Sequence, residues 1–413
     1  MMLLRNKRKY KSVYDIFLQK EVDSYMNVRK TIRRSSGRES RNNHDMPQKK
    51  NSGFLGRVIR RFFLVLFAVV IMLASVLLMV LNLVFNGPSP TARDQLAMAL
   101  IEASATKWVP ALFIGEEAVA ELKSDGGDVG LQDDVTDANA VIINRAGLTA
   151  NADEWANYPD GIRIESIEGA TYKAKVMLVR NPSQVYLGIS THNGFSTSIP
   201  GKRLNVAIED ESAIAAVNAG AFNDDGTSGS YVGSLPEGLV YSEGNCVWKT
   251  GAPPNGITGF AGFNKDNILV VHKDNITAAQ AEELNIRDGC CFGPVLIMNG
   301  EINMEAYNKA SGLNPRTAIG QRTDGAVIFV CIDGRQPSSM GGEYKDIIDI
   351  MVEYGAINAC NMDGGSSTVM MYRDTYGLYG EKGQVQMMNS YSLLQTEPRK
   401  MPDFWLVRPA EEG

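Results

Sequence analysis

Apolar residues form one long run near the N-terminus and many short runs in the C-terminal half. Residues 62–85 carry no charge, and only Ser75 and Asn82 among them are polar. A helix of this length spans roughly 36 Å at about 1.5 Å per residue, enough to cross a hydrocarbon core of about 30 Å. The run is too long, and too far from the N-terminus, for the core of a signal peptide. We expect a transmembrane helix over residues 62–85.

The short apolar runs of the C-terminal half have the length of β-strands. Residues 174–179 and 185–189 flank Asn181-Pro182-Ser183, a pattern that predicts a β-hairpin. Helical spacing appears at residues 277–284 and 344–354. The pattern therefore mixes strands with a few short helices.

The helix expected at residues 344–354 lies between apolar runs that end at Ile332 and near Cys360. Strand, helix and strand in this order predict a crossover connection. We expect a single domain of the α+β (mixed α/β) class over residues 171–410, which is long enough for one buried core.

Residues 86–170 have a weaker pattern and are interpreted as a partly helical juxtamembrane stalk. Helical spacing covers residues 94–113, with Thr91 as a possible cap, and a second short helix is expected at residues 115–122. Residues 123–134 are acidic and rich in glycine, which is typical of a linker.

Charge is distributed very unevenly about the long apolar run. Residues 1–61 hold 17 Lys and Arg against five Asp and Glu, a net charge of +12; the whole chain is −6, so the remainder carries −18. Arg57, Arg60 and Arg61 adjoin the run, so the positive-inside rule predicts a cytoplasmic N-terminus and an extracellular C-terminal domain of a single-pass cell-membrane protein.

The basic tail itself is polar and predicts disorder over residues 33–53. It could contact anionic lipid headgroups. A nucleic-acid role is the other interpretation of a basic tail, but no recognition motif or interleaved aromatic residue supports it, and we expect no nucleic-acid partner.

The cysteine pattern predicts no metal site of the zinc type, because no ligand spacing fits one. Two cysteines lie inside apolar runs and are expected to be buried, two are adjacent, and the odd total leaves at least one outside any intramolecular pairing; the five are Cys246, Cys290, Cys291, Cys331 and Cys360.

Four blocks of the C-terminal half share one form, in which a short apolar run is followed or preceded by polar residues and glycine. Strand ends that gather such residues on neighbouring loops often build a functional site on a rigid sheet. The blocks are Asn218–Phe222, Arg316–Gly320, Asp333–Arg335 and Asn361–Thr368.

In this order the blocks resemble the phosphodiester glycosidase family, over roughly residues 172–409. The segments Gly293–Leu296 with Asn299-Gly300, and Pro236–Val240, also resemble family elements. The chain departs from the family pattern at Ala219 and Ala221, where glycine and an aromatic residue are usual, and it has two glycines before Ser366 where three are common.

The resemblance implies hydrolysis of a sugar-1-phosphodiester at the anomeric carbon. Together with the expected membrane span and orientation, it predicts a membrane-anchored extracellular glycosidase that acts on a cell-surface or exopolysaccharide glycan. Glycoside cleavage usually needs one carboxylate at the anomeric carbon and another group that handles protons. The candidates are Asp363 and Asp333, with Glu237 as a third, and the sequence does not assign their separate roles.

Substrate binding is expected at the same blocks, because forked guanidinium groups suit phosphate and glycine N–H groups suit an anion. The candidates are Arg316, Arg335, Asn218, Thr317, Gly364, Gly365, Ser366 and Ser367. Simpler interpretations remain for each: an Asp-Gly turn, a structural Arg–Asp pair, or an asparagine that serves the backbone.

No cofactor is required by this chemistry, although aspartates could coordinate Ca²⁺ or Mg²⁺, so the metal content is left open. The sequence has no nucleophile elbow, P-loop or dinucleotide fingerprint. The alternative function is a non-catalytic module that binds or assembles a cell-surface glycopolymer.

Overall fold

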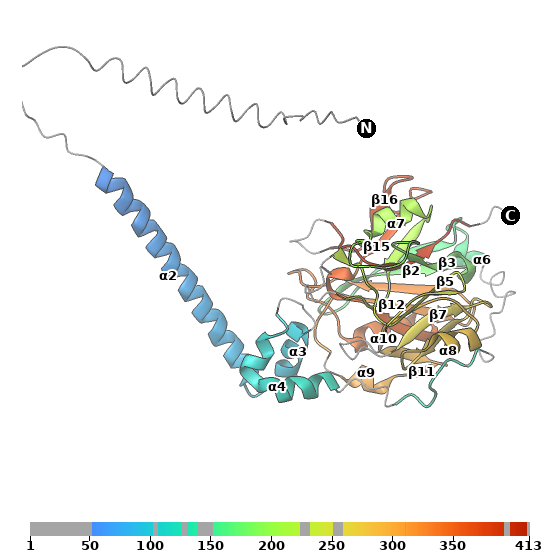
Figure 1. Ribbon diagram of the computed structural model, residues 1–413, viewed down its shortest axis with the longest axis horizontal. Helices are drawn as coiled ribbons and strands as arrows, with labels where there is room; N and C mark the ends of the chain where they lie inside the picture. The colour runs from blue at the N-terminus through green and yellow to red at the C-terminus, as the bar shows by residue number, and fades with distance from the viewer. Residues whose placement is uncertain are drawn as a thin grey trace, which may run out of the picture. The chain divides into compact units, whose positions relative to one another are not determined.

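The computed structural model describes residues 52–101, 106–124, 130–138, 152–223, 232–250, 259–309, 311–391 and 397–410 (Figure 1). Helix α2 runs from Ser52 to Phe85. Its segment Arg57–Phe85, which includes an 18-residue stretch with a mean hydropathy of 3.2, is long and apolar enough to cross a membrane. The tail before Ser52, which is predicted to be cytoplasmic and includes nearly all of the segment predicted to be disordered, lies outside the described residues.

Two helices follow α2, where one continuous helix over residues 94–113 was expected. Helix α3 spans Pro90–Ile101 and α4 spans Val109–Ser124, and a turn at residues 106–108 precedes α4. The cap also differs, because Ser89 rather than Thr91 accepts a hydrogen bond from the first helical turn. Gly115, with φ +84°, interrupts α4 because a left-handed residue cannot continue a helix.

The C-terminal domain contains three antiparallel sheets. The first has seven strands in the order β1-β2-β13-β12-β14-β10-β11. Their bounds are Ile162–Glu168 (β1), Lys173–Val179 (β2), Val327–Ile332 (β13), Arg316–Arg322 (β12), Ala356–Met362 (β14), Val295–Met298 (β10) and Glu301–Ile302 (β11).

The other two sheets have five strands each, in the orders β16-β15-β4-β17-β3 and β6-β5-β9-β7-β8. The second sheet comprises Val385–Met387 (β16), Met370–Arg373 (β15), Ala215–Asn218 (β4), Asp403–Val407 (β17) and Val185–Ile189 (β3). The third comprises Asn245–Lys249 (β6), Leu239–Ser242 (β5), Ile286–Cys291 (β9), Phe260–Asn264 (β7) and Leu269–His272 (β8).

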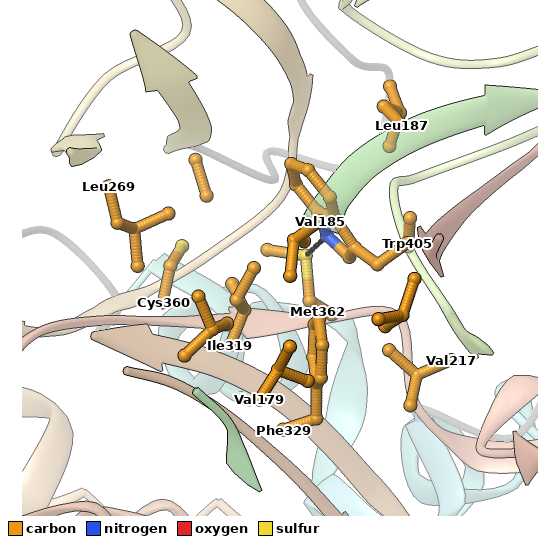
Figure 2. Packing of buried hydrophobic residues seen from close by; sticks show 14 of the residues in the cluster. Val179, Val185, Leu187, Val217, Leu269, Ile319, Phe329, Cys360, Met362 and Trp405 are labelled. Atoms are coloured by element: carbon orange, nitrogen blue, oxygen red, sulfur yellow. Dashed lines mark hydrogen bonds between the residues drawn. The ribbon is translucent and has the colours of Figure 1, made fainter. Parts of the chain in front are cut away.

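One hydrophobic core receives side chains from all three sheets (Figure 2). Phe329 and Met362 enter it from the first sheet, Trp405 and Val217 from the second, and Leu269 from the third. The Trp405 indole N–H donates to the Met362 sulfur at 3.4 Å, which satisfies the one polar atom of that side chain. The second face of each sheet packs into a smaller cluster of its own.

A short helix contributes to each of these smaller clusters. Helix α10 (Tyr344–Glu353) packs with the first sheet, α7 (Leu204–Asp210) with the second and α8 (Ala278–Glu283) with the third. The helices expected at residues 344–354 and 277–284 are thereby confirmed, the latter with a capping box between Thr277 and Gln280. The remaining short helices are α6 (Ala152–Trp155), α9 (Met304–Asn308), η1 (Pro182–Gln184) and η3 (Gly365–Ser367). The α+β class of the domain is confirmed.

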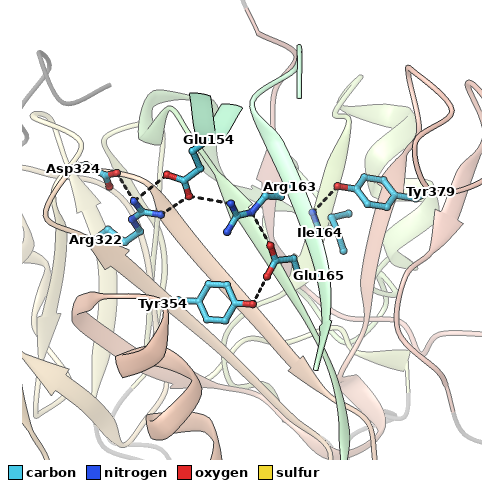
Figure 3. Close-up of polar contacts among 8 residues, drawn as sticks. All are labelled: Glu154, Arg163, Ile164, Glu165, Arg322, Asp324, Tyr354 and Tyr379. Carbon is cyan, nitrogen blue, oxygen red and sulfur yellow. Dashed lines mark hydrogen bonds and ion pairs between the residues drawn. The ribbon is translucent and has the colours of Figure 1, made fainter. Parts of the chain in front are cut away.

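The first sheet extends N-terminal to the boundary expected at residue 171, because β1 pairs with β2 along all seven of its residues. A polar network also ties this segment to the sheet (Figure 3). Glu154 of α6 accepts from both Arg322 of β12, at 2.9 Å, and Arg163 of β1, at 3.2 Å. Residues from α6 onward are thus part of the folded domain rather than of a stalk.

The hairpin expected between residues 174–179 and 185–189 is wrong. Strand β2 lies in the first sheet, whereas β3 lies in the second and pairs with β17. Between them Asn181 caps the η1 turn, and every residue of β3 is buried. A strand buried on both faces belongs inside a layered core, so the chain crosses to another sheet instead of folding back.

The crossover through α10 is confirmed, with one strand inserted. Strands β13 and β14 both pair antiparallel with β12, which lies between them, so they run parallel to each other. Cys331 of β13 and Cys360 of β14 are fully buried and face the shared core. Both strands therefore deliver the residues that follow them, including Asp333 and Asp363, to the same end of the sheet.

Candidate active site

The four sequence blocks converge at the ends of β4, β12, β13 and β14. Asn218, the last residue of β4, is fully buried and joins three of them. Its amide nitrogen donates to the Asp363 carbonyl oxygen at 2.5 Å. Its amide oxygen accepts from the Thr317 hydroxyl at 2.8 Å and from the Val369 N–H at 3.2 Å. Asn218 and Thr317 thus support the backbone of the site from below.

The Gly364–Ser366 turn has geometry that a larger residue would not tolerate. A Cβ added to Gly364 would lie only 2.7 Å from the Pro315 carbonyl oxygen. Gly365 has φ +59° and its N–H donates to the same carbonyl at 2.9 Å. The two glycines therefore let the turn lie against the start of β12, since neither a side chain nor a right-handed backbone fits.

A small cavity of about 60 Å³ lies beside this turn. Its walls come from the Asp333–Arg335 block, the Gly365–Thr368 block and a segment that follows β16, which the sequence analysis did not select. The lining residues are Pro315, Asp333, Gly334, Arg335, Gly365, Ser366, Thr368, Asn389, Ser390 and Tyr391. The Thr368 hydroxyl is buried in this wall and has no hydrogen-bond partner among the described residues.

Asp333 is the one predicted carboxylate in the cavity wall. It is 5% exposed, and its Oδ1 accepts from the Asn389 amide at 3.2 Å and the Ser390 N–H at 3.0 Å. Burial raises the pKa of Asp333 above its ordinary value, and the hydrogen bonds from Asn389 and Ser390 only partly oppose that shift. The carboxyl group therefore keeps its proton to a higher pH than a free aspartate does.

Arg335 places an exposed guanidinium group at the cavity. The residue has φ +58°, and its Nη2 donates to the Asn314 side chain at 3.2 Å. Both Nη atoms lie 3.3 Å from the position that a Cβ on Gly365 would occupy. Arg335 and Gly365 therefore pack directly against each other, and the glycine leaves room for the guanidinium.

Arg399 is a second cation at the same turn, and sequence reasoning missed it. Its Nη1 donates to the Ser366 hydroxyl at 3.1 Å, and its guanidinium stacks 4.7 Å from the centre of the Phe222 ring. Tyr391 also donates to the Ser366 carbonyl oxygen. No motif marks residues 389–399, although Asn389-Ser390 repeats the pattern of polar residues after an apolar strand.

Hydrogen bonds to its backbone position Asp363. The residue is not among those that line the cavity. Its N–H donates to the Ala219 carbonyl oxygen at 3.1 Å, while Asn218 holds its carbonyl. Its charge raises the pKa of two neighbours, Tyr391 in the cavity wall and the buried Asp403, in each case after the larger effect of burial. The Asp363 carboxylate is therefore near enough to Tyr391 and Asp403 to affect the pKa of each.

Asp403, at the start of β17, is a further carboxyl group that the sequence did not indicate. It is 1% exposed, and its Oδ1 accepts from the Gly220 N–H at 2.8 Å. Its Oδ2 has no hydrogen-bond partner among the described residues. Burial raises its pKa to about 7, and Asp363 adds to the shift, whereas the Gly220 hydrogen bond opposes it.

Arg316 does not line the cavity, although the sequence suggested it for phosphate binding. Its side chain is buried, with Nη2 donating to the carbonyl oxygens of Ser311, at 2.6 Å, and Gly312, at 3.0 Å. Its Nε donates to the Gly342 carbonyl at 2.9 Å, and its guanidinium stacks on Tyr344 at 4.2 Å. These contacts hold together the loops around the start of β12.

The remaining candidates lie near the turn without lining the cavity. Glu237 is 5% exposed, and its N–H donates to the Ala221 carbonyl at 2.8 Å, next to the first block. Ser367 is buried in the η3 turn, where its N–H donates to the Gly364 carbonyl at 3.0 Å. The geometry thus brings Asp333, Arg335, Gly365 and Ser366 together at one cavity.

A metal site is not built from the described residues, among which no group of three or more His, Cys, Asp or Glu side chains is arranged to hold an ion. The question of a Ca²⁺ or Mg²⁺ requirement is not tested by this geometry and stays a prediction.

Residues 211–408 match the model of the phosphodiester glycosidase family, and this part of the chain is a domain of that family. The resemblance of the four blocks is thereby confirmed. A curated relative is the SPbeta prophage-derived uncharacterized protein YomE of Bacillus subtilis, 24% identical over 192 residues, which are 46% of this chain. The match spans only 27% of that protein's length.

Two solved structures are similar to part of this chain. The catalytic domain of zebrafish N-acetylglucosamine-1-phosphodiester alpha-N-acetylglucosaminidase, auto-inhibited by its pro-peptide, is 19% identical, with a TM-score of 0.46 over 62% of this chain and 85% of that one. A hypothetical protein from Synechocystis is 17% identical, with a TM-score of 0.38 over 60% of this chain and 61% of that one. Similarity at this level does not by itself indicate function.

Proposed function

We propose that the domain hydrolyses a sugar-1-phosphodiester at the anomeric carbon, with the phosphate bound in the cavity beside the η3 turn. The family match of residues 211–408 supports a glycosidase of this type. The observation that carries the assignment of the phosphate is the exposed guanidinium of Arg335 in a cavity whose wall also contains Gly365 and Thr368. Guanidinium groups and glycine-rich turns are the usual protein partners of phosphate.

The size of the cavity supports a phosphate rather than a whole sugar phosphate. About 10–15 Å³ is enough for one water-sized group, so a cavity of about 60 Å³ suits a phosphate with its few heavy atoms. The pyranose then lies outside it, toward Asp363. The buried Thr368 hydroxyl, without a described partner, is available to hydrogen-bond a phosphate oxygen.

Charge at the turn supports stabilisation of the departing phosphate. Arg335 and Arg399 approach Gly365 and Ser366 respectively, so the turn carries two cations. Preorganised donors aimed at developing negative charge lower the barrier, because they need no reorganisation during the reaction. The Arg316 guanidinium already donates hydrogen bonds to three backbone carbonyls. We therefore assign phosphate binding to Arg335, with Arg399 as a second cation.

The two aspartates then receive different roles. Asp333, whose pKa is raised by burial, is the candidate acid that protonates the departing phosphate oxygen. Asp363 is the candidate carboxylate at the anomeric carbon, where its negative charge favours an oxocarbenium-like transition state. Glu237 is the reserve candidate. A phosphate is a good leaving group, so Asp363 and the cations carry more of the catalysis than the acid does.

The location proposed for this activity is the outer face of the cell membrane. The single described helix that is long and apolar enough to span a bilayer supports an anchor, and the basic residues before it support a cytoplasmic N-terminus. A cell-surface or exopolysaccharide glycan is the substrate class that such a location implies. No cofactor enters this mechanism, so we expect full activity after removal of divalent cations with a chelator.

The deciding experiment incubates the full chain in detergent with a panel of sugar-1-phosphodiesters and measures free reducing sugar. We expect Asp363→Asn to slow turnover by at least about 10²-fold, with an unchanged melting temperature. Asp266→Asn, at an exposed position on another part of the domain, is the matched control. Turnover of Asp363→Asn at the wild-type rate would show that this carboxylate has no catalytic role.

The same assay separates the enzyme from a glycopolymer-binding module. A binding module would release no sugar from any phosphodiester and would keep its ligand affinity in Asp363→Asn. Arg335→Ala is expected to raise KM for phosphodiesters, because the contact to phosphate is lost. Arg373→Ala, which removes an arginine paired with Glu209 at the β15 strand, is its control.

A further inference from the structure

Large apolar side chains remain uncovered at the start of α4, beside the end of the apolar helix. Trp108 is 61% exposed and Leu112 is 70% exposed. Trp108 is the turn residue directly before α4, and Leu112 lies in the first turn of that helix; we call these two exposed side chains the Trp108–Leu112 face. Lys107, also exposed, precedes them. Exposed tryptophan and leucine on one face are unusual for a surface in contact only with water.

The position of this face is fixed by a neighbouring contact. The rings of Phe85, the last residue of α2, and Phe113 of α4 are stacked, with centroids 4.9 Å apart and planes 12° from parallel. Phe85 is 2% exposed as a result. Phe113 directly follows Leu112 in sequence, so the Trp108–Leu112 face begins where the apolar helix ends.

The neighbouring helix α3 packs against the domain. Ala97 and Met98 of α3 are buried, and Gln95 donates to Glu343 at the start of α10 at 3.1 Å. Gly312 lies against the α3 backbone, with the Ala99 nitrogen 2.6 Å from the position of an added Cβ. The domain therefore covers α3, whereas the Trp108 and Leu112 side chains stay exposed.

We propose that Trp108 and Leu112 insert into the headgroup region of the bilayer, so that α4 begins as a membrane-interface helix. This inference rests on the proposed membrane anchoring by α2. The ends of a transmembrane helix lie at the interface, where tryptophan is enriched because its ring is apolar and its N–H is polar. Lys107 can extend its amine to lipid phosphates while its carbon chain stays with the apolar face.

The polarity of α4 changes at the point where the helix is interrupted. Gly115, with φ +84°, breaks the helix, and the exposed residues that follow are Glu116 and Glu117. Anionic side chains are unfavourable near a bilayer of anionic lipids, so the inserted segment ends at the break. The observations favour lipid over a second copy of the chain, because Phe85 and the face are contiguous.

The test uses the full chain in nanodiscs of phosphatidylcholine and phosphatidylglycerol, with and without bromine atoms on the upper part of the acyl chains. The Trp108 signal is the fluorescence difference between the wild type and Trp108→Phe. We expect this signal to be blue-shifted and to lose intensity in the brominated discs. Trp248→Phe gives the matched control, since the Trp248 indole N–H donates to the Pro236 carbonyl within the domain and its signal should not be quenched.

Each other outcome overturns the proposal in a distinguishable way. If the chain co-purifies with the discs and the Trp108 signal is unquenched, α2 is an anchor and the face does not contact lipid. If the signal is unquenched and Leu112→Ser also lowers the oligomeric state of the chain, a second copy covers the face and shields Trp108 from the brominated lipid. If the chain does not enter discs at all, the membrane anchoring itself is wrong and this inference is lost with it.

Discussion

Asn218 shows how much of the site depends on single polar side chains. With no exposed surface it holds the Asp363 carbonyl, the Thr317 hydroxyl and the Val369 N–H. Buried polar groups of this kind stabilise a structure only when every partner is present. The sequence indicated Asn218 as a contact to substrate, whereas the structure places its amide among backbone and side-chain partners of the domain.

At Asp403 we predict a pH-dependent contribution to stability. Its pKa is raised by burial to about 7, so the folded state binds the proton more tightly than the unfolded state does. The contribution is fully present below the unfolded pKa of about 3.9 and is lost as the pH rises through about 7. The unfolding free energy of Asp403→Asn should therefore rise relative to that of the wild type as the pH increases through this window. Above the window the difference should stay constant.

Urea unfolding of both proteins at several pH values between 4.5 and 8.5, chosen to bracket that window, measures this difference. Asn keeps an oxygen for the Gly220 N–H, so the local structure is conserved. Asp274→Asn, at an exposed site, is the control. A difference that does not change with pH would mean that Asp403 is ionised in the folded protein throughout.

At Gly365 we predict that Gly365→Ala weakens phosphate binding. A residue other than glycine at φ +59° costs about 1–2 kcal/mol, and its Cβ would approach the Arg335 guanidinium at 3.3 Å. Competition by inorganic phosphate in the hydrolysis assay measures the effect, with Gly383→Ala as the control because that glycine has φ +81° and open space around it. Equal phosphate affinity in both variants would contradict the proposed position of the phosphate.

At the scale of elements, the start of β12 depends on Arg316. Three backbone carbonyls of neighbouring loops accept hydrogen bonds from this one guanidinium, and the side chain is 4% exposed. The strand itself lies between β13 and β14 and begins beside the η3 turn. The integrity of these loops is therefore a condition for the geometry of the cavity.

We predict that Arg316→Ala lowers stability in addition to activity. Leaving a buried carbonyl without its donor costs about 1–3 kcal/mol, so the loss of three donors should remove more than about 2 kcal/mol of unfolding free energy. Chemical denaturation measures the loss, with Arg335→Ala as the comparison that should stay close to the wild type. A wild-type melting profile for Arg316→Ala would instead favour the direct phosphate role that the sequence suggested.

At the scale of the whole molecule, charge and hydropathy predict that the C-terminal domain lies outside the cell. The described structure has one candidate span, at Arg57–Phe85, and the net positive charge lies before it. We predict that protease added to intact cells removes the chain beyond about Pro90 and spares the N-terminal tail. Antibodies against each end, with permeabilised cells as the control, measure this; a protected C-terminal domain would reverse the proposed orientation.

Local pattern was sufficient where an element depends mainly on its own residues. The apolar helix, α8, α10, and the burial of Cys331 and Cys360 all follow from helical periodicity and from the apolar runs. The family and the convergence of its four blocks followed from the order of the motifs. These are properties that the chain carries at short range or in the sequence of its motifs.

Tertiary structure alone decided which strands pair and which polar side chains reach the cavity. Strands β2 and β3 have the pattern of a hairpin, yet they belong to different sheets. Arg316 and Arg335 are equally basic in sequence; the first points into three carbonyls and the second into the cavity, because their backbones enter from different strands. Asp403 and Arg399 reach the site from segments far along the chain, and contacts at such separation leave no local pattern to detect.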